Sequence, residues 1–374
     1  MKKLIIIGIV LAACAGFAMP CAAEQLSDEY IRNSGIYESA AQLDKETKQI
    51  IEQLGIDEIT AQNVYALDFS SVLKSVLASF KTAFSDNIKA ILMVMGIVIT
   101  AALTDASTDK LTEKNQSFFG VIATLVIALS VAVPLSKMLS LASVTVKSAS
   151  VFTISAVPVM CVVTAAQGKT ISASLCSAGA VGIAQVLSSV FSEFFMPLCY
   201  ILPALGMCAA ADTSLKTERI ISLMRKYIFV ALSACSVLYF TVLSLRTSIA
   251  CAVDESTVKT IKFASSNFVP VIGSAISDSA VAVAASLAVC KNTIGVFGIV
   301  CLAAVFLPLL SQIFVWLIGL ELGAVMAETF GILSVEKLLK SLKDTLRLLL
   351  VIIVFCAVLF LIHFGVLLGL RGAV

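Results

Sequence analysis

Long apolar stretches separated by short polar ones dominate the pattern of this chain. A membrane-crossing helix needs about 17–25 mainly apolar residues, and stretches of this kind occupy residues 88–103, 118–135, 178–211, 227–245, 293–320 and 348–370. The third stretch is too long for one straight crossing, so we expect either one tilted helix or a helical hairpin that turns near Glu193 and Pro197. The pattern predicts an all-α, polytopic membrane protein.

Short polar and small-residue motifs recur between these stretches. Thr-Val-Lys occurs at 145–147 and 257–259, Val-Pro-Val at 157–159 and 269–271, and Ser-Leu at 174–175 and 286–287, and each pair is 112 positions apart. Three matches at one offset indicate a duplicated unit. We therefore predict two internal repeats, at about 118–211 and 227–320.

Each repeat carries a proline in a stretch rich in Ser, Ala and Thr. Pro158 and Pro270 each remove a backbone donor, which predicts a broken helix whose free carbonyls need new partners. If each broken segment dips into the membrane and returns, every repeat makes two crossings and the copies are parallel. If each crosses fully, the copies are inverted. A cavity-lining role and a purely structural kink are both consistent with these prolines, and the duplication favours the first.

The first 86 residues differ from the rest. Residues 1–23, with a basic start and an apolar run, predict a signal peptide; a lipoprotein site at Cys14 and an uncleaved first helix are the alternatives. Residues 24–86 predict an acidic, extracytoplasmic helical region. It ends in an amphipathic helix over 69–84, which lies in the membrane interface or packs on the protein's own membrane domain. The polytopic domain then covers residues 87–374, ending in the span 348–370.

Composition excludes a water-soluble protein. The chain is 59% hydrophobic and 13% charged, with a mean hydropathy of +1.04, whereas soluble domains are roughly 45–50% apolar and 25% charged. Its charge is unevenly distributed: residues 24–86 hold 11 acidic and five basic residues, whereas residues 87–374 hold 13 acidic and 19 basic ones. The acidic part is therefore expected to be a separate aqueous region.

Positive charge predicts the orientation. Two basic clusters follow apolar stretches, one of Lys216, Arg219, Arg225 and Lys226 and one of Lys337, Lys340, Lys343 and Arg347. Cytoplasmic loops carry an excess of Lys and Arg, so we expect both clusters to be cytoplasmic. Parallel repeats satisfy this expectation and leave both termini outside the cytoplasm, in agreement with the signal peptide.

Residues that carry out catalysis are scarce. His363 is the single histidine and lies inside the last apolar stretch, so a catalytic triad or a histidine metal site has no supporting residues. An interhelical hydrogen bond is favoured for His363 over a proton relay. The cysteines are scattered through apolar segments without a Cys-x-x-Cys motif. We expect no enzyme activity, no cofactor, no metal and no nucleic-acid partner; the partner that composition requires is the lipid bilayer.

Charges within apolar stretches are better candidates, because each costs about 2.5–3.5 kcal/mol at the bilayer centre. Glu193 lies within the stretch 178–211, Asp278 comes just past the second Val-Pro-Val, and Lys291 opens the next span. On a functional interpretation, these charges line a polar path or pair with one another. On a structural interpretation, they mark turns and loops. With Pro158 and Pro270 they are our candidate pore or assembly positions. A Gly-x-x-x-Gly motif at 319–323 favours close helix packing.

One long motif makes the chain similar to a known family. Residues 268–278, Phe-Val-Pro-Val-Ile-Gly-Ser-Ala-Ile-Ser-Asp, are followed by Lys-Asn-Thr-Ile-Gly-Val at 291–296. Together with the signal peptide, the acidic region and the polytopic body, they resemble the stage III sporulation protein AE family over essentially the whole chain. The resemblance implies a non-enzymatic membrane subunit of the channel or secretion-like complex that links mother cell and forespore. It is expected in the mother-cell membrane around the forespore, where spore development needs it after engulfment.

The same resemblance implies the partners. They are other sporulation membrane proteins and a secretion-type ATPase subunit. The family has no established catalytic residues, so none are expected here. The alternative hypothesis is a stand-alone secondary transporter or permease with its substrate site at the duplicated Val-Pro-Val segments.

Overall fold

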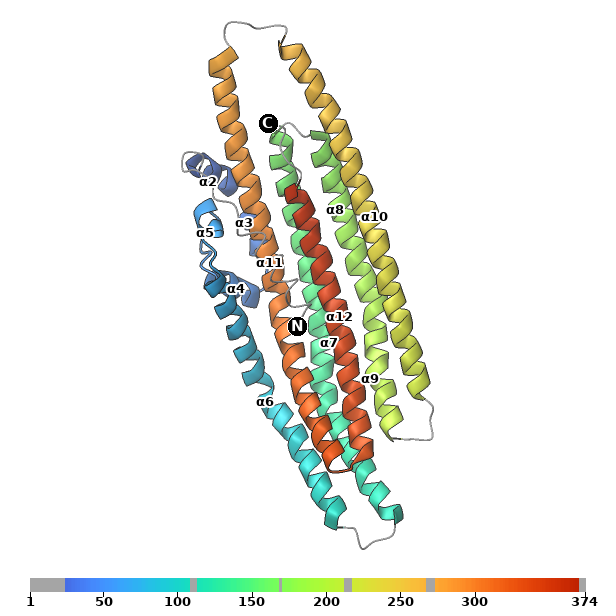
Figure 1. The fold of residues 1–374 in the computed structure, drawn as a ribbon. Coiled ribbons are helices and arrows are strands. Elements are labelled where there is room, and N and C mark those ends of the chain that lie inside the picture. The colour runs from blue at the N-terminus through green and yellow to red at the C-terminus, as the bar shows by residue number, and fades with distance from the viewer. Residues whose placement is uncertain (1–23, 108–112, 168–169, 212–216, 267–272, 370–374) are drawn as a thin grey trace.

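A computed structural model describes residues 24–107, 113–167, 170–211, 217–266 and 273–369, and within these ranges no residue forms a strand. Figure 1 shows a bundle of long helices with a group of short ones against its side. The short helices are α2 (Glu24–Asn33), α3 (Ile36–Ala41), α4 (Lys45–Gln53) and α5 (Ala61–Tyr65). The long segments are α6 (Phe69–Ser107), α7 (Glu113–Ala166), α8 (Thr170–Val190), η2 (Phe191–Phe195), α9 (Met196–Ala211), α10 (Thr217–Ser266), α11 (Gly273–Thr329) and α12 (Leu333–Gly369).

Six helical segments among the described residues are long and apolar enough to cross a membrane. They alternate in direction, so that α6, α8–α9 and α11 run down in Figure 1 while α7, α10 and α12 run up. Their lengths of 28 to 45 residues correspond to about 42–68 Å at 1.5 Å per residue, whereas a bilayer core is about 30 Å thick. The fold is therefore that of a polytopic helical membrane protein whose helices exceed the membrane thickness.

The structure corrects the predicted break at Pro158. Helix α7 continues through both Pro134 and Pro158, so the first Val-Pro-Val segment extends a helix instead of dipping and returning. Val157 is fully buried. A proline lacks one backbone hydrogen bond, and the prediction took this loss to break the helix. In a packed bundle, neighbouring helices hold the turn in place, so the helix continues. Pro270 lies outside the described residues.

The apolar stretch 178–211 forms one continuous helical segment. Helices α8 and α9 are joined without a turn by the π-helical segment η2, which excludes the helical hairpin. Glu193 lies inside η2, and Pro197 follows two residues after its end. A π-turn is a local widening of an α-helix, and here it ends two residues before Pro197, which lacks the normal backbone donor. Where the sequence predicted a possible turn near Glu193 and Pro197, the chain instead changes from α-helix to π-helix and back.

The direction of the duplicated segments agrees with parallel copies. Helices α7 and α10 carry the two Thr-Val-Lys tripeptides, and both run upward in Figure 1. The second Val-Pro-Val lies outside the described residues. The internal repeat therefore stays a prediction.

Helix α6 is continuous across residue 86, where the polytopic domain is predicted to begin. The apolar stripe predicted over 69–84 is divided between two environments. Phe80 packs edge-on against Phe314 of α11, with ring centroids 6.0 Å apart. The other large members of the stripe are exposed: Phe69, Leu73, Leu77 and Phe84.

Aromatic side chains and glycines hold the centre of the bundle together. Phe152 of α7 stacks on Phe364 of α12 at 6.0 Å, and Phe364 in turn fills the space beside Gly298 of α11. Farther along α11, Gly319 lies against Ile91 of α6, where an added Cβ would be only 2.8 Å from that side chain. The close packing predicted from Gly-x-x-x-Gly is confirmed.

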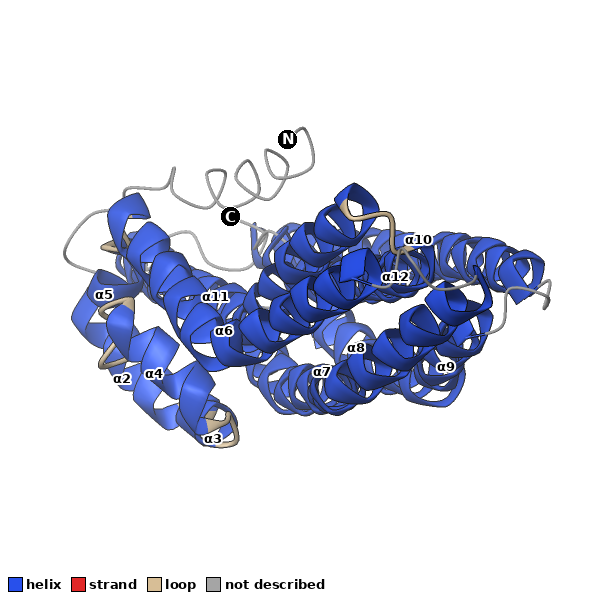
Figure 2. Ribbon diagram, turned by 90° about the horizontal axis from the view of Figure 1, so that it is seen from below, coloured by secondary structure: helices blue, strands red, loops and turns tan. Residues whose placement is uncertain are grey.

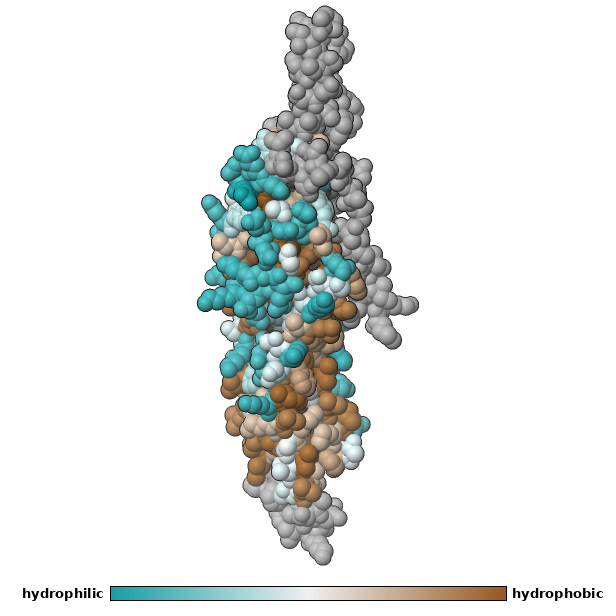
Figure 3. Space-filling model, turned by 90° about the vertical axis from the view of Figure 1, so that its left-hand side faces the viewer, coloured by the Kyte–Doolittle hydropathy of each residue, from teal (hydrophilic) through white to brown (hydrophobic). Residues whose placement is uncertain are grey.

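Figure 2 shows helices α2–α5 gathered on one side of the bundle, beside α6 and α11. On that face, hydrophilic residues cover the upper part and apolar ones predominate below (Figure 3). The short helices thus lie on the hydrophilic part of this face.

Candidate functional site

The first Val-Pro-Val segment lies where the short N-terminal helices meet the bundle. Gly35 links α2 to α3 with φ of +81°, a left-handed conformation that glycine adopts without strain. A Cβ placed on Gly35 would lie 3.9 Å from Val159 of α7. Ile31 and Ile36, on either side of this turn, are fully buried. The first Val-Pro-Val segment thus lies beside the turn between α2 and α3, and α3 packs on α7.

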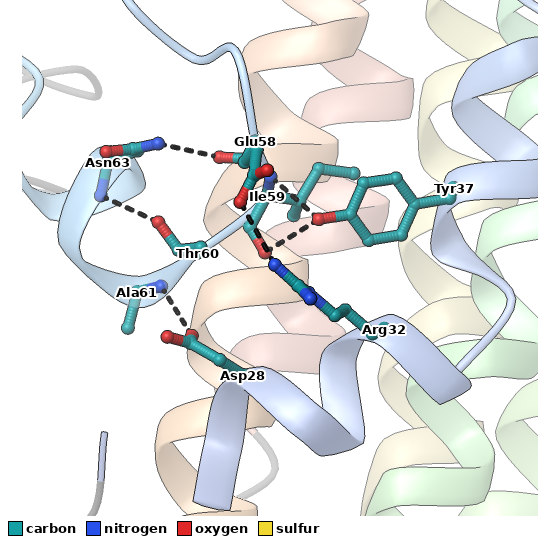
Figure 4. Close-up of polar contacts among 8 residues, drawn as sticks. All are labelled: Asp28, Arg32, Tyr37, Glu58, Ile59, Thr60, Ala61 and Asn63. Carbon is teal, nitrogen blue, oxygen red and sulfur yellow. Dashed lines mark hydrogen bonds and ion pairs between the residues drawn. The ribbon is translucent and has the colours of Figure 1, made fainter. Parts of the chain in front are cut away.

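Polar contacts fix the connection between α4 and α5 onto α2 and α3 (Figure 4). The backbone amide of Ile59 donates to the Tyr37 hydroxyl at 3.1 Å, and that of Ala61 donates to the Asp28 carboxylate at 3.2 Å. Arg32 pairs with Glu58 at 3.3 Å. Sequence reasoning did not single out these residues, because each lies 22 to 33 positions from its partner.

One feature of this connection, the N-terminal cap of α5, can be recognised from the local sequence. The Thr60 hydroxyl accepts from the amide of Asn63 at 3.3 Å and so caps α5. A threonine before a short helical pattern predicts such a cap.

The pKa values of two side chains in this region, Tyr65 and Glu46, are raised by their surroundings. Burial raises the pKa of Tyr65, whose hydroxyl is hydrogen-bonded to Thr293 of α11. Burial also raises the pKa of Glu46 in α4, and the nearby carboxylates of Asp44 and Asp86 raise it further. Asp86 belongs to α6, so its charge places α4 next to α6. The carboxylates of Glu46 and Asp86 repel each other, so packing holds α4 against α6.

The structure brings two of the candidate residues into one region. Met160, two residues after Pro158, lies against Gly295 of α11, and Lys291 is one helical turn before that glycine. Lys291 is only 3% exposed. Helix α11 also carries Asp278, although the described side chains do not include it. The role of these residues as pore or assembly positions stays a prediction.

Glu193 is not part of this region. It is exposed, within η2, and lies 18 residues before Ala211, about 27 Å from the lower end of α9. Pro158 lies 45 residues beyond Glu113, about 68 Å from the lower end of α7. The structure therefore does not bring Glu193 and Pro158 together; Pro270 and the side chain of Asp278 lie outside what it describes.

The basic clusters lie together at the opposite end of the bundle. Helices α10 and α12 both begin at the lower end in Figure 1. There Arg225 pairs with Asp344 at 2.7 Å, and Lys343 pairs with Glu321 of α11, also at 2.7 Å. Both clusters are thus on the same side, as the positive-charge pattern predicts; Lys216 lies outside the described residues.

His363 makes the interhelical hydrogen bond that the sequence favours. Its Nδ1 lies 3.3 Å from the hydroxyl of Tyr239 on α10, and this hydroxyl donates to the backbone oxygen of Leu359 at 2.8 Å. His363 is 4% exposed. No group of three or more His, Cys, Asp or Glu side chains in the described part of the chain could hold a metal ion.

Comparison with known proteins decides the family. The family model described as stage III sporulation protein AE matches residues 52–370, which include every long helix of the bundle. The chain belongs to this family. A family relative, the stage III sporulation protein AE of Bacillus subtilis (strain 168), is 24% identical over 156 residues. That alignment covers 41% of this chain and 39% of the relative.

No solved structure matches the chain. The helix arrangement of this stage III sporulation protein AE family member is therefore described from its own structure, without a solved relative for comparison. The family match begins at residue 52, within α4, so α2 and α3 precede the matched stretch. The resemblance inferred from the motif around Pro270 is confirmed at the level of the family.

Proposed function

We propose that the chain is a non-enzymatic, integral membrane subunit of the channel or secretion-like complex that links mother cell and forespore. Spore development needs it after engulfment. The observation that carries this proposal is the match of residues 52–370 to the stage III sporulation protein AE family. The same residues form the six candidate membrane spans, which suits a subunit built into a membrane.

The exposed faces of the bundle support a role in assembly. Helices α6 and α10 present many large apolar side chains to their surroundings, among them Leu92, Met93, Leu103, Tyr227, Val230, Val237 and Leu238. Large exposed apolar patches mark contact with a membrane or with other proteins. Lipid and neighbouring subunits are the surroundings that these two helices fit.

The two ends of the bundle suit different partners. Its basic end, held by Arg225 and Asp344, faces the cytoplasm in this proposal, where a secretion-type ATPase subunit acts. The polar face formed by α2–α5 (Figure 3) then lies outside the cytoplasm, toward other sporulation membrane proteins. The protein resides in the mother-cell membrane around the forespore.

An in-frame deletion tests this function. We expect the deletion strain to complete engulfment, arrest before spore maturation and form far fewer heat-resistant spores. The full-length chain expressed from a second locus should restore the count. Normal heat-resistant spore counts in the deletion strain would refute the proposal.

Affinity purification of a tagged chain from sporulating cells tests the assembly. The tagged chain should co-purify with other sporulation membrane proteins and with an ATPase subunit. Recovery of the chain alone, under conditions that preserve a second known membrane complex, would contradict a role as a subunit.

A further inference from the structure

A pocket with several charged side chains opens at the basic end of the bundle, between α9, α10 and α12. It has a volume of about 270 Å³ and is lined by Gly206, Ala209, Ile221, Ser222, Arg225, Lys337, Lys340, Ser341 and Asp344. Gly206 lets α9 and α12 approach closely, because a Cβ there would lie 2.2 Å from the Ser341 hydroxyl. The pocket is thus bordered by the consecutive helices α9 and α10 and by α12, which is distant in the sequence.

Two hydrogen-bond donors that line this pocket lack acceptors. Arg225 uses one guanidinium nitrogen for Asp344, at 2.7 Å, but its Nε is buried without a hydrogen-bond partner. The Ser341 hydroxyl is likewise buried without a partner. Buried polar atoms in proteins nearly always have one, so such an atom calls for an explanation. A ligand that accepts hydrogen bonds would satisfy both.

The charges around the pocket favour an anion. Three of its lining residues are cationic, Arg225, Lys337 and Lys340, and one, Asp344, is acidic. Lys340 is held by Glu328 and Glu336, at 3.0 and 2.5 Å. None of the ion pairs found among the described residues includes Lys337, which is exposed. Its ammonium group is therefore available to a bound anion.

The pocket lies where lipid headgroups are expected. Arg225 comes two residues before the apolar stretch 227–245, and Asp344 comes four residues before the stretch 348–370. Tyr227 is 68% exposed, and exposed tyrosines are enriched at the membrane–water boundary. Leu223, also exposed, continues the apolar surface beside the pocket. An anion bound here would be next to a surface that suits acyl chains.

We propose that this pocket binds the phosphate group of an anionic phospholipid, with Arg225 Nε, the Ser341 hydroxyl and Lys337 as donors. Basic pockets between membrane helices on the cytoplasmic side suit such headgroups. A free phosphate ion presents the same acceptor oxygens. The boundary position and the adjoining apolar surface favour the lipid over the ion.

Native mass spectrometry of the delipidated full-length chain tests the lipid. The chain is titrated with phosphatidylglycerol and with phosphatidylcholine of identical acyl chains. We expect clear preference for phosphatidylglycerol, weakened about fivefold by Lys337→Gln, the change expected for one cation near a membrane surface. Ser341→Ala should weaken it as well. Equal binding of the two lipids by the unchanged protein would overturn the proposal.

Two controls make the test specific. Lys147→Gln removes an exposed cation of α7 that does not line the pocket, and it should leave the preference unchanged; an equal loss in this variant would overturn the site. Lys337→Gln breaks no ion pair that holds the fold, so it remains informative if Arg225→Gln fails to fold. Inorganic phosphate is the second ligand. Phosphate binding that depends on Lys337 and Ser341, without preference for phosphatidylglycerol, would overturn the lipid assignment.

Discussion

The guanidinium group of Arg225 lies 2.7 Å from the carboxylate of Asp344, 119 residues farther along the chain. This ion pair joins the N-terminal parts of α10 and α12 and so brings the two basic clusters to one end of the bundle. The contact supports the orientation inferred from positive charge, because both clusters must then lie on the same side of the membrane.

A double-mutant cycle on Arg225→Gln and Asp344→Asn should show that this ion pair is favourable. We expect a coupling free energy of about 0.2–1 kcal/mol, because both side chains are partly exposed. Equilibrium unfolding in mixed SDS micelles measures it. The exposed pair Arg32 and Glu58 serves as the control and should couple more weakly. Additive effects at Arg225 and Asp344 would contradict the ion pair.

Asn87 of α6 should contribute strongly to stability. Its side-chain oxygen accepts from the indole nitrogen of Trp316 at 2.8 Å, and Trp316 is 1% exposed. Asn87→Ala would leave this buried donor without a partner, at a cost of about 1–3 kcal/mol in the free energy of unfolding. Thr241→Ala, at an exposed position whose hydroxyl bonds within its own helix, should change that free energy by less than about 0.5 kcal/mol. Equal effects would argue against the contact.

The contact between α6 and α11 should not accept a larger residue at Gly319. An added Cβ would lie 2.8 Å from Ile91, and forcing a larger side chain into a packed site costs about 1–3 kcal/mol. We expect Gly319→Leu to lower the free energy of unfolding by this amount. Gly96→Leu on α6, where nothing lies within 4 Å of an added Cβ, is the matched control. A similar loss in both variants would mean that Gly319 is not a packing contact.

Much of the fold could be predicted because a membrane imposes simple rules. The lengths of the apolar stretches predict the membrane spans, and the lysine and arginine clusters predict which ends of the helices lie on the same side. Both patterns reflect local transfer free energies. The helix at Pro158 could not be predicted in the same way. Whether a proline breaks a helix depends on the neighbours that hold the turn, and these neighbours come from distant segments.

The candidate site likewise combines residues that the local sequence identifies with residues whose role depends on distant segments. Lys291 is a candidate because it is a charge at the opening of a predicted span, and it is buried. The donors of the basic pocket were visible in the sequence only as members of a charged cluster. Ser341 gave no signal at all, because its lack of a partner follows from the approach of α9 to α12.

The start of α6 should become less stable in acid. Asp68 has a pKa below its ordinary value of 3.8, mainly because its carboxylate accepts from the Ser70 hydroxyl and also from the backbone of Ser70. A lowered carboxyl pKa stabilises the folded state above the ordinary value, and this contribution disappears as the pH falls through the lowered pKa. Hydrogen-exchange protection of residues 70–72 should therefore drop at acid pH.

The variant Asp68→Asn isolates this effect. It lacks the titrating group, so the acid-dependent loss of protection in residues 70–72 should be much smaller than in the unchanged chain. Protection is compared after correction for the intrinsic pH dependence of exchange. An unaltered acid response in Asp68→Asn would assign it to another group.

The most direct test of the account is the side of the membrane on which each end lies. Single cysteines replace Glu29 in α2 and Arg219 in α10, both exposed, in a chain whose native cysteines are changed to alanine. The variants are expressed in vegetative cells, where the chain inserts into the outer cell membrane, and intact cells are treated with a membrane-impermeant maleimide before and after permeabilisation. The account predicts labelling of Glu29→Cys in intact cells and of Arg219→Cys only after permeabilisation. Labelling of both in intact cells, or of Arg219→Cys alone, would contradict it.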